Sequence, residues 1–376
     1  MDFNLSEEQQ LLKDSVDRFV LDSYDFETRR KLSNTDEGYS EDNWKTFAEL
    51  GWLAVGLPEE YGGFGGAVET MIVMEAVGKG LITEPYLQTV VLCGGMIAKS
   101  GSEAQKTELL GAIAEGGLKM SFAQAEPTSR FNLADVSTTA RKSGDGYVLN
   151  GAKSVVYGAP MADKLIVSAR TGGDQRDEDG ISLFIVDNNA SGVSRRDYPT
   201  ADGLRASEVT LENVEVGADA LLGGEGEGLA TIQAGVDGAI AALCAEAVGC
   251  MQVLHDETNE YLKTRKQFGV PIGKFQVLQH RMVDCFIELE QSRSMSYLAT
   301  LKLDEDTAER RKAATAAKAQ IGKGGTFIGQ QSVQMHGGMG MTDELKISHY
   351  YKRLMQIDVM FGNRDWQLKE FAALTQ

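Results

Sequence analysis

The sequence predicts an α+β chain made of three regions: helices in residues 1–118, an antiparallel β region in 119–222 and helices again in 223–376. Apolar residues recur with a helical period at both ends of the chain and with a period of two in the middle, which is the main signal for this assignment. At 376 residues the chain is longer than the roughly 250–300 residues at which a single hydrophobic core stops growing, so several domains are expected. No helical signal separates the predicted strands, and this excludes a βαβ arrangement.

The first helical region opens with a capping-box pattern, in which Ser6 is followed three residues later by Gln9. Apolar side chains then recur on one face of the predicted helix: Leu11, Leu12, Val16, Phe19 and Val20. A glycine-rich run at residues 61–66 interrupts the helices. We interpret it as a turn, because it lacks the GxGxxG order of a dinucleotide-binding loop.

The middle region contains short apolar segments bounded by glycine, aspartate and asparagine, which is typical of strands joined by turns. The predicted strands include residues 147–149, 164–168, 182–186, 209–211 and 214–216. In the C-terminal region, small and apolar residues between positions 239 and 265 predict one long helix. The pair Gly337-Gly338 is expected to break a later helix.

Composition excludes several classes of function. The formal net charge of −18 argues against a nucleic-acid-binding protein and against a polybasic membrane surface. The chain has four cysteines and four histidines without a CxxC pair, so we expect no metal site. The N-terminus lacks a signal-peptide pattern and no apolar run is long enough for a membrane span, so the sequence predicts a cytoplasmic protein with reduced cysteines.

Three stretches near the C-terminus carry candidate chemistry. The first, residues 265–269 (RKQFG), places Arg265 where its guanidinium could pair with a diphosphate, or it could simply end a helix with Gly269 following the cap. The second, residues 334–340 (QMHGGMG), carries paired glycines, which either let backbone amides approach a ligand or only interrupt a helix. The third, residues 350–353 (YYKR), could be a charged helix face exposed to solvent.

In their order and spacing, these stretches resemble those of the acyl-CoA dehydrogenase family, and the resemblance covers nearly the whole chain. The N-terminal motifs are residues 7–9 (EEQ) and 58–63 (PEEYGG). The central motifs are residues 125–127 (AEP), 138–140 (TTA), 150–153 (NGAK), 162–163 (AD) and 169–171 (ART). Each motif is weak alone, but the ordered series is specific.

The resemblance implies an N-terminal helical domain, a middle β barrel and a C-terminal four-helix bundle. It implies FAD as the cofactor, an acyl-CoA thioester as the substrate, an electron-transfer flavoprotein as the acceptor, and assembly into a tetramer. In the family, residues of the C-terminal motifs reach the FAD of a neighbouring subunit. Here these cofactor-binding positions are Arg265, Phe268, Gln276, Gln334, Gly337 and Gly338, and Asp237 is implied to lie near the CoA ester.

The resemblance fails at the catalytic base. The family's glutamate lies a fixed distance after the paired glycines, and counting from Gly340 places Phe361 at that position. Some members carry the glutamate instead at the start of the long helix before the RKQFG motif, and that position is Ala239. Neither phenylalanine nor alanine can take up a proton. We therefore expect no catalytic base in this chain.

The positions that serve a subunit's own flavin and CoA are also altered. In the family they hold a threonine and a serine at the flavin, a WIT triplet, and an arginine near CoA. The corresponding residues here are Ala125, Phe131, Val155, Val156, Tyr157 and Ile240. The residues that serve the chain's own site are thus changed, whereas those that reach a neighbour's site are kept.

Three hypotheses follow. The first, which we favour, is a subunit without a base in a heteromeric α2β2 acyl-CoA dehydrogenase, whose paralogous partner supplies the glutamate. The second is a self-sufficient homotetramer that uses a different acid, such as Asp237 or Asp358. The third is a changed function on the same fold: a flavin monooxygenase, or a binding protein without flavin.

Overall fold

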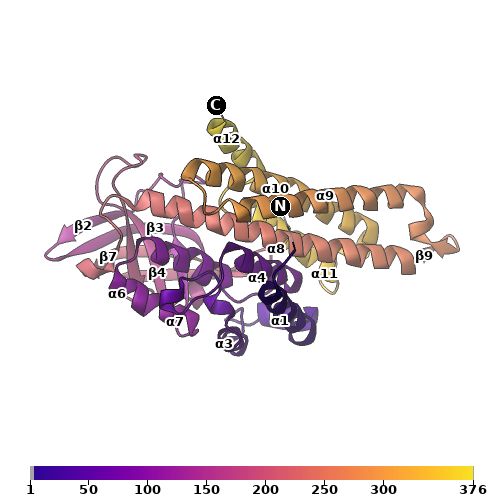
Figure 1. Ribbon diagram of the computed structural model, residues 1–376. Coiled ribbons are helices and arrows are strands. Elements are labelled where there is room, and N and C mark those ends of the chain that lie inside the picture. Colours follow the sequence, from indigo (N-terminus) through magenta and orange to yellow (C-terminus); the bar gives the residue numbers. More distant parts are fainter. Residues whose placement is uncertain (1–3, 376) are drawn as a thin grey trace. The chain divides into compact units, whose positions relative to one another are not determined.

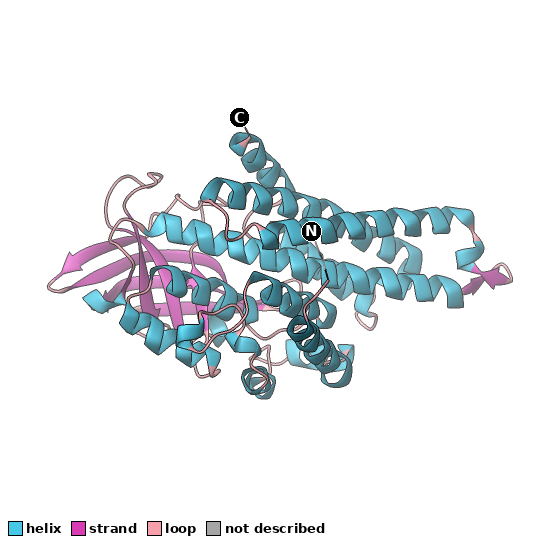
Figure 2. Cartoon of the chain, in the orientation of Figure 1, coloured by secondary structure: helices cyan, strands magenta, loops and turns pink. Residues whose placement is uncertain are grey.

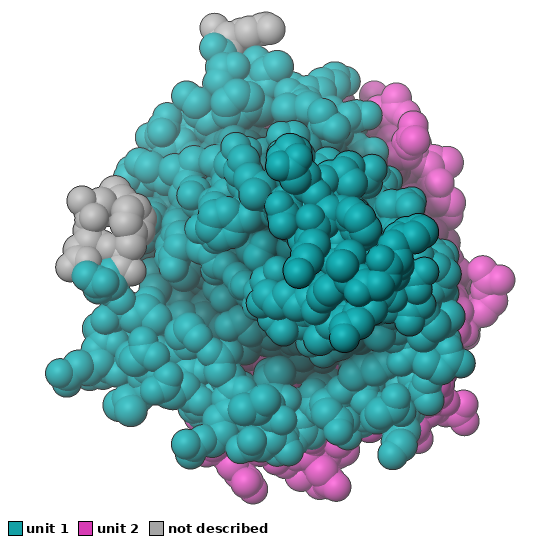
Figure 3. Space-filling model, turned by 90° about the vertical axis from the view of Figure 1, so that its right-hand side faces the viewer, with its two compact units in different colours: residues 1–31, 67–82, 240–376 teal, residues 32–66, 83–239 magenta. Residues whose placement is uncertain are grey.

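The computed structural model describes residues 4–375, with helices at both ends of the chain and a sheet between them in the sequence (Figures 1 and 2). The chain forms two compact units that are not consecutive segments of the sequence. Unit 1 comprises residues 1–31, 67–82 and 240–376, and unit 2 comprises residues 32–66 and 83–239 (Figure 3). The chain therefore passes from one unit to the other several times.

The predicted capping box at the first helix is confirmed. Ser6 Oγ accepts a hydrogen bond from the backbone N–H of Gln9 at 3.2 Å, and the backbone N–H of Ser6 donates to Gln9 Oε1 at 2.9 Å. This helix, α1 (Glu7–Ser23), packs against α4 (Ala67–Gly80) in unit 1. The chain between them contains α2 (Phe26–Ser33) and, in unit 2, α3 (Glu41–Glu49).

Further short helices of unit 2 precede the sheet. They are η1 (Trp52–Ala54), η2 (Glu59–Tyr61), η3 (Leu87–Gly94), α5 (Gly95–Ser100), α6 (Glu103–Gln105), η4 (Lys106–Leu110) and α7 (Gly111–Ala114). Both η3 and η4 are π-helical. The glycine-rich residues 61–66 form a turn, as expected, with Gly62 and Gly65 at positive φ.

The middle region folds into one sheet, to which the described residues contribute eight strands. They are β1 (Met120–Ala123), β2 (Thr139–Ser143), β3 (Gly146–Tyr157), β4 (Lys164–Arg170), β5 (Ile181–Asp187), β6 (Val193–Pro199), β7 (Arg205–Val216) and β8 (Leu221–Leu222). Their order is β6-β7-β3-β2-β4-β5-β8, with β1 beside β4. The β1–β4 and β2–β4 pairs are parallel, so the sheet is mixed, and the expected antiparallel order holds only for the other pairs. No tight hairpin joins β1 to β4, so chain connectivity does not impose an antiparallel direction.

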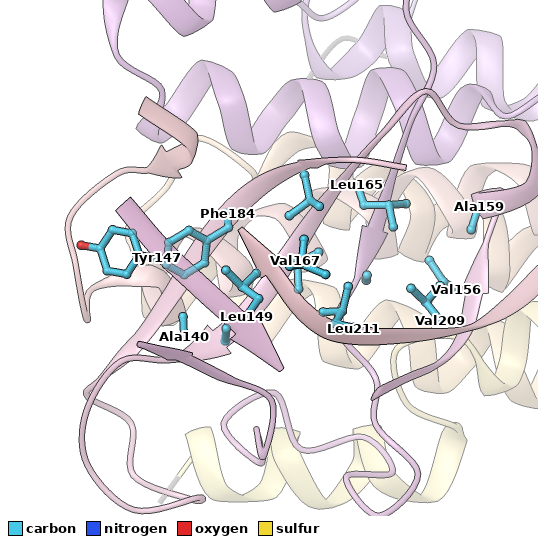
Figure 4. Close-up of a cluster of buried hydrophobic side chains, with 14 of the residues drawn as sticks. Ala140, Tyr147, Leu149, Val156, Ala159, Leu165, Val167, Phe184, Val209 and Leu211 are labelled. Carbon is cyan, nitrogen blue, oxygen red and sulfur yellow. The ribbon is translucent and has the colours of Figure 1, made fainter. Parts of the chain in front are cut away.

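The core of unit 2 lies between the inward-facing side chains of β3, β4, β5 and β7 (Figure 4). Leu149, Val167 and Val209 are fully buried there, and Tyr147 packs edge-on against Phe184 with ring centroids 4.9 Å apart. Alternate residues of each strand supply this core, which is the period of two that the sequence displays.

The C-terminal helices of unit 1 pack around one central member. This helix, α10 (Thr307–His336), contacts α9 (Gln276–Leu301), α11 (Lys346–Val359) and α12 (Arg364–Leu374). The preceding helix, α8 (Gly228–Thr264), begins well before the predicted residue 239, because Gly235 and Gly238 weaken the helical signal that they interrupt. Among the described residues α8 alone is long and apolar enough for a membrane span, but 89% of its most apolar window is buried, which is typical of a core helix.

Two of the motifs in unit 2 meet at a buried ion pair. Lys153 Nζ lies 2.7 Å from Glu126 Oε1, and both side chains are at most 1% exposed. The carboxylate of Glu126 also accepts hydrogen bonds from the backbone N–H groups of Ser137 and Thr138, and Lys153 donates to Ser168 Oγ. Burial alone would raise the pKa of Glu126, but the ammonium of Lys153 and these hydrogen bonds lower it to about 2. The AEP and NGAK motifs therefore have a structural role in joining β3 to the segment after β1.

Replacing Lys153 by methionine is expected to destabilise the protein by about 3–5 kcal/mol, because it leaves the carboxylate of Glu126 buried without its counter-ion. A matched control is Lys142→Met, since Lys142 pairs with Glu225 at 2.8 Å but is 67% exposed. That control is expected to change the free energy of unfolding by less than about 1 kcal/mol. Urea unfolding at pH 7 measures both, and equal losses would contradict the structural role of the buried pair.

Candidate functional site

The RKQFG motif forms a hairpin at the end of α8. Helix α8 ends at Thr264, and β9 (Lys266–Gln267) then pairs with β10 (Val270–Pro271). The two residues between these strands, Phe268 and Gly269, have φ angles of 54° and 79°, as a type I′ turn requires. The alternative in which Gly269 directly follows a helix cap is therefore wrong. The hairpin projects beyond the ends of α8 and α9 (Figure 1).

Three predicted cofactor-binding residues in and after this hairpin face solvent. Phe268 is 91% exposed at the tip, although it is the kind of side chain that folding normally buries. Arg265 is exposed, and its guanidinium makes no hydrogen bond or ion pair with residues 4–375. Gln276 is exposed at the first position of α9. Among residues 4–375, the ring of Phe268 meets only the edge of Phe275, with centroids 6.2 Å apart, and this contact leaves it almost fully exposed.

The paired glycines follow the last residue of α10. Gly337 has φ 63° and ψ −143°, a conformation that L-amino acids with a side chain rarely adopt. A Cβ atom built on Gly337 or Gly338 would have no neighbour within 4 Å, whereas one on Gly340 would lie 2.7 Å from the carbonyl oxygen of Val333. Packing thus explains the glycine at position 340 but not the one at 338. The backbone at Gly338 is open, and another molecule can approach it closely. Gln334, one turn earlier, is also exposed.

A ring stack brings these two motifs together in unit 1. Tyr261 lies four residues before Arg265, and its ring stacks on His336 with centroids 4.2 Å apart and planes inclined by 28°. His336 Nδ1 lies 2.8 Å from the carbonyl oxygen of Ser332, and burial lowers the pKa of His336, so that its ring is neutral at pH 7. The six predicted cofactor-binding residues therefore belong to elements that meet at one end of the helical unit. Exposed donors and an open glycine surface fit the diphosphate of a dinucleotide.

The turn that carries Phe361 is fixed by hydrogen bonds. Lys318 of α10 is fully buried, and its Nζ donates to the carbonyl oxygens of Asp358 and Gly362 at 2.8 and 2.9 Å. Gln367 Nε2 donates to the carbonyl oxygen of Phe361 at 2.7 Å, and Phe361 is held at a φ of 55°. Sequence reasoning missed Lys318. The signal was a single lysine within the small and apolar run of residues 313–322 (AATAAKAQIG).

Neither of the two positions that the resemblance assigns to the catalytic base holds a carboxylate. Ala239, the alternative position, is completely buried. Asp358 Oδ1 accepts a hydrogen bond from the backbone N–H of Arg364 at 3.1 Å and so helps to begin α12. Asp237 is only 5% exposed, and it lies in unit 2, as does Ala239.

A second buried carboxylate, Glu246, was also missed from the sequence. Arg353 binds it through both nitrogens of its fork, with Nε–Oε1 and Nη2–Oε2 distances of 2.5 and 2.9 Å. Because Arg353 and Tyr350 are each 5% exposed, the interpretation of residues 350–353 as a solvated helix face is wrong for these two residues. The bidentate pair occupies the carboxylate of Glu246, which is therefore poorly suited to act as a base.

The altered positions of the chain's own flavin site lie in unit 2. The carbonyl oxygen of Ala125 accepts a hydrogen bond from the backbone N–H of Ser154 at 2.8 Å, which places the AEP motif beside the altered triplet. Val155 has a φ of 51° and is 40% exposed, at a β-bulge between Lys153 and Val156. Phe131 and Tyr157 are half-buried. Within residues 4–375 no cluster of potential metal ligands exists.

The two adjacent glycines provide a matched test of these roles. Gly337→Ala is expected to destabilise the isolated chain by about 1–3 kcal/mol, because alanine is strained at φ 63°. Gly338→Ala is expected to change the free energy of unfolding by less than about 0.5 kcal/mol, since the added methyl group meets open space. Chemical denaturation of both variants measures the difference, and a large loss for Gly338→Ala would mean that packing explains this glycine.

Comparisons with known proteins agree with the resemblance seen in the sequence. The family models for the N-terminal, middle and C-terminal domains of acyl-CoA dehydrogenases match residues 6–117, 121–214 and 226–373. Acyl-CoA dehydrogenase FadE12 of Mycobacterium tuberculosis is 33% identical over 353 residues, which cover 91% of this chain and 89% of the relative.

Solved structures resemble the whole chain. The FAD complex of PigA has a TM-score of 0.91 at 28% identity and covers 99% of this chain and 98% of its own. The ChsE4–ChsE5 complex from Mycobacterium tuberculosis has a TM-score of 0.90 at 25% identity, with coverage of 99% and 98%. The fold class predicted from the sequence is thereby confirmed, and so is FAD as the cofactor. This chain belongs to the acyl-CoA dehydrogenase family of FAD-dependent oxidoreductases.

Proposed function

We propose that this chain is the subunit without a catalytic base in a heteromeric α2β2 enzyme that dehydrogenates an acyl-CoA thioester. A paralogous subunit supplies the glutamate, and an electron-transfer flavoprotein accepts the electrons. The observation that carries the proposal is Phe361, which stands in an ordered, hydrogen-bonded turn and which the resemblance places at the position of the family's base. The turn is kept, and only the reacting group is missing.

The chemistry explains why this loss is decisive. Forming an α,β double bond requires a base to remove the α-proton while the flavin accepts the β-hydride. The aromatic ring of Phe361 has no lone pair for a proton. Of the neighbouring acids in unit 1, Glu246 is bound by both nitrogens of Arg353, and Asp358 accepts from the backbone of α12. A proton acceptor from another chain resolves this deficit.

The exposed surfaces of unit 1 support assembly with another chain. Four apolar side chains of α9 are about half exposed: Val277 (59%), Val283 (56%), Phe286 (51%) and Ile287 (46%). A groove of about 720 Å³ runs between α9, α10 and α12, with Phe286 and Leu368 among its lining residues. Apolar side chains left half exposed on a helix and beside such a groove are typical of subunit interfaces.

The distribution of kept and altered residues favours unequal subunits. Arg265 and Gln334 have exposed side chains that make no hydrogen bond with residues 4–375, and Gly338 is exposed; all three are available to a flavin held by another subunit. The chain's own site has lost hydroxyl groups at Ala125 and Phe131, which reduces the hydrogen bonds that it can offer. The ChsE4–ChsE5 complex is a structurally similar relative with two named chains. The four buried cysteines suit the reducing cytoplasm as the place of action.

Flavin content tests the proposal most directly. The chain should be purified alone and after co-expression with an adjacent paralogue, and flavin absorbance per subunit should be measured in both. We expect substoichiometric FAD and little dehydrogenation by the isolated chain, but one FAD per two chains and full turnover in the mixed assembly. One tightly bound FAD per isolated chain, with turnover near the typical enzyme median of about 10 s⁻¹, would overturn the proposal.

Arg265 provides a second test within the mixed assembly. Arg265→Ala is expected to weaken FAD binding by about 1.5–3 kcal/mol, or roughly ten- to over a hundredfold in Kd, because it removes a charged hydrogen bond to the diphosphate. Lys266→Ala is the control, since Lys266 is exposed on the same hairpin and carries the same charge. Fluorescence titration of FAD measures both. Equal affinities in an intact assembly would mean that Arg265 does not contact the flavin.

A further inference from the structure

A groove with mostly apolar walls and a few polar groups lies where the last turns of α8 meet the residues that lead into α9, near β9, an element labelled in Figure 1. Its volume is about 480 Å³, which is within the range of pockets that hold small molecules, roughly 300–1,000 Å³. The polar lining residues are Asn259, Lys263, Lys274 and Gln279, and Leu262 and Met282 are among the apolar ones. All of these residues belong to unit 1.

The charge around this groove is opposite to that of the chain. Residues 259–282, which span the lining, contain five lysines and arginines and one acid, Glu260, whereas the whole chain has a formal net charge of −18. Lys274 is exposed and makes no hydrogen bond or ion pair with residues 4–375. Lys263 pairs with Glu260 at 2.5 Å, but the two side chains are 59% and 65% exposed, so this contact is weak and easily exchanged.

On α8 the groove lies on a different face from the surface assigned above to FAD. Asn259, Leu262 and Lys263 have the spacing i, i+3 and i+4, and they therefore share one face of α8. Tyr261 lies on another face of the same helix, where it stacks on His336 beside the paired glycines. The groove residues of α8 and the paired glycines thus lie on different sides of this helix. The proposed contacts with FAD give no role to Lys263 or Lys274.

The polar groups of the lining match a specific ligand chemistry. Two ammonium groups suit a phosphate dianion, and lysine binds phosphate as a point charge. The apolar walls suit a flat ring, and Asn259 offers an amide with both a donor and an acceptor. Gln279 Nε2 donates to the carbonyl oxygen of Gly273 at 2.9 Å, which fixes the side chain and leaves its oxygen available. We propose that this groove binds a free nucleotide through its phosphate groups, as a site independent of the flavin.

Isothermal titration with ADP tests the proposal on the co-expressed assembly saturated with FAD, so that the flavin site is filled. We expect saturable binding of one ADP per copy of this chain that weakens as salt concentration rises. Lys274→Glu is expected to weaken ADP binding by roughly tenfold or more, because it reverses one charge at the phosphate. The matched control is Lys45→Glu on α3, where Lys45 is 66% exposed, and it is expected to leave ADP binding unchanged.

A second variant removes space and leaves the charge unchanged. Met282→Trp fills the apolar side of the groove, and we expect it to weaken ADP binding but not the binding of inorganic phosphate, which needs only the lysines. Failure of ADP to bind at millimolar concentration would overturn the proposal. So would equal ADP affinities in the wild-type chain, Lys274→Glu and Met282→Trp, and so would ADP binding that disappears when FAD is added.

Discussion

The ammonium group of Lys318 determines where residue 361 stands. It is buried inside the helical unit and donates to two carbonyl groups that lie on either side of Phe361. Burial lowers the pKa of Lys318 to about 8, yet the group remains a hydrogen-bond donor in both protonation states. These hydrogen bonds hold the end of α11 near the start of α12. They therefore fix the connection between the two helices and, with it, the place of Phe361.

Much of the fold could be predicted from the sequence, because the burial of one face of a helix or strand makes apolar residues recur along the chain with the period of that element. The strands at residues 164–168 and 182–186 lie within β4 and β5, where alternate side chains enter one core. The beginning of α8 was missed, because its stability comes from burial of small residues and its glycines give no helical signal. The parallel pairing of β1 with β4 is a long-range feature that no local pattern encodes.

The candidate site was predictable only in part, and the reason differs between residues. Arg265 and Gly337 could be named by resemblance, but the hairpin that follows Arg265 required the φ angles of Phe268 and Gly269. Lys318 and Glu246 were missed from the sequence, because their roles depend on partners that lie 40 and 107 residues away along the chain. A buried charged residue is informative only when its partner is known.

The hydrogen bonds that hold the turn of Phe361 involve backbone carbonyl groups, and none of them uses the side chain at this position. The fold therefore tolerates different side chains there, and the reacting group can be lost by a single substitution without unfolding the protein. After a gene duplication, one copy can lose its glutamate while the other still performs the reaction in a shared assembly. From then on neither copy is dispensable, and selection maintains two genes where one sufficed. A rigid turn thus makes the division of labour between paralogues accessible in one evolutionary step.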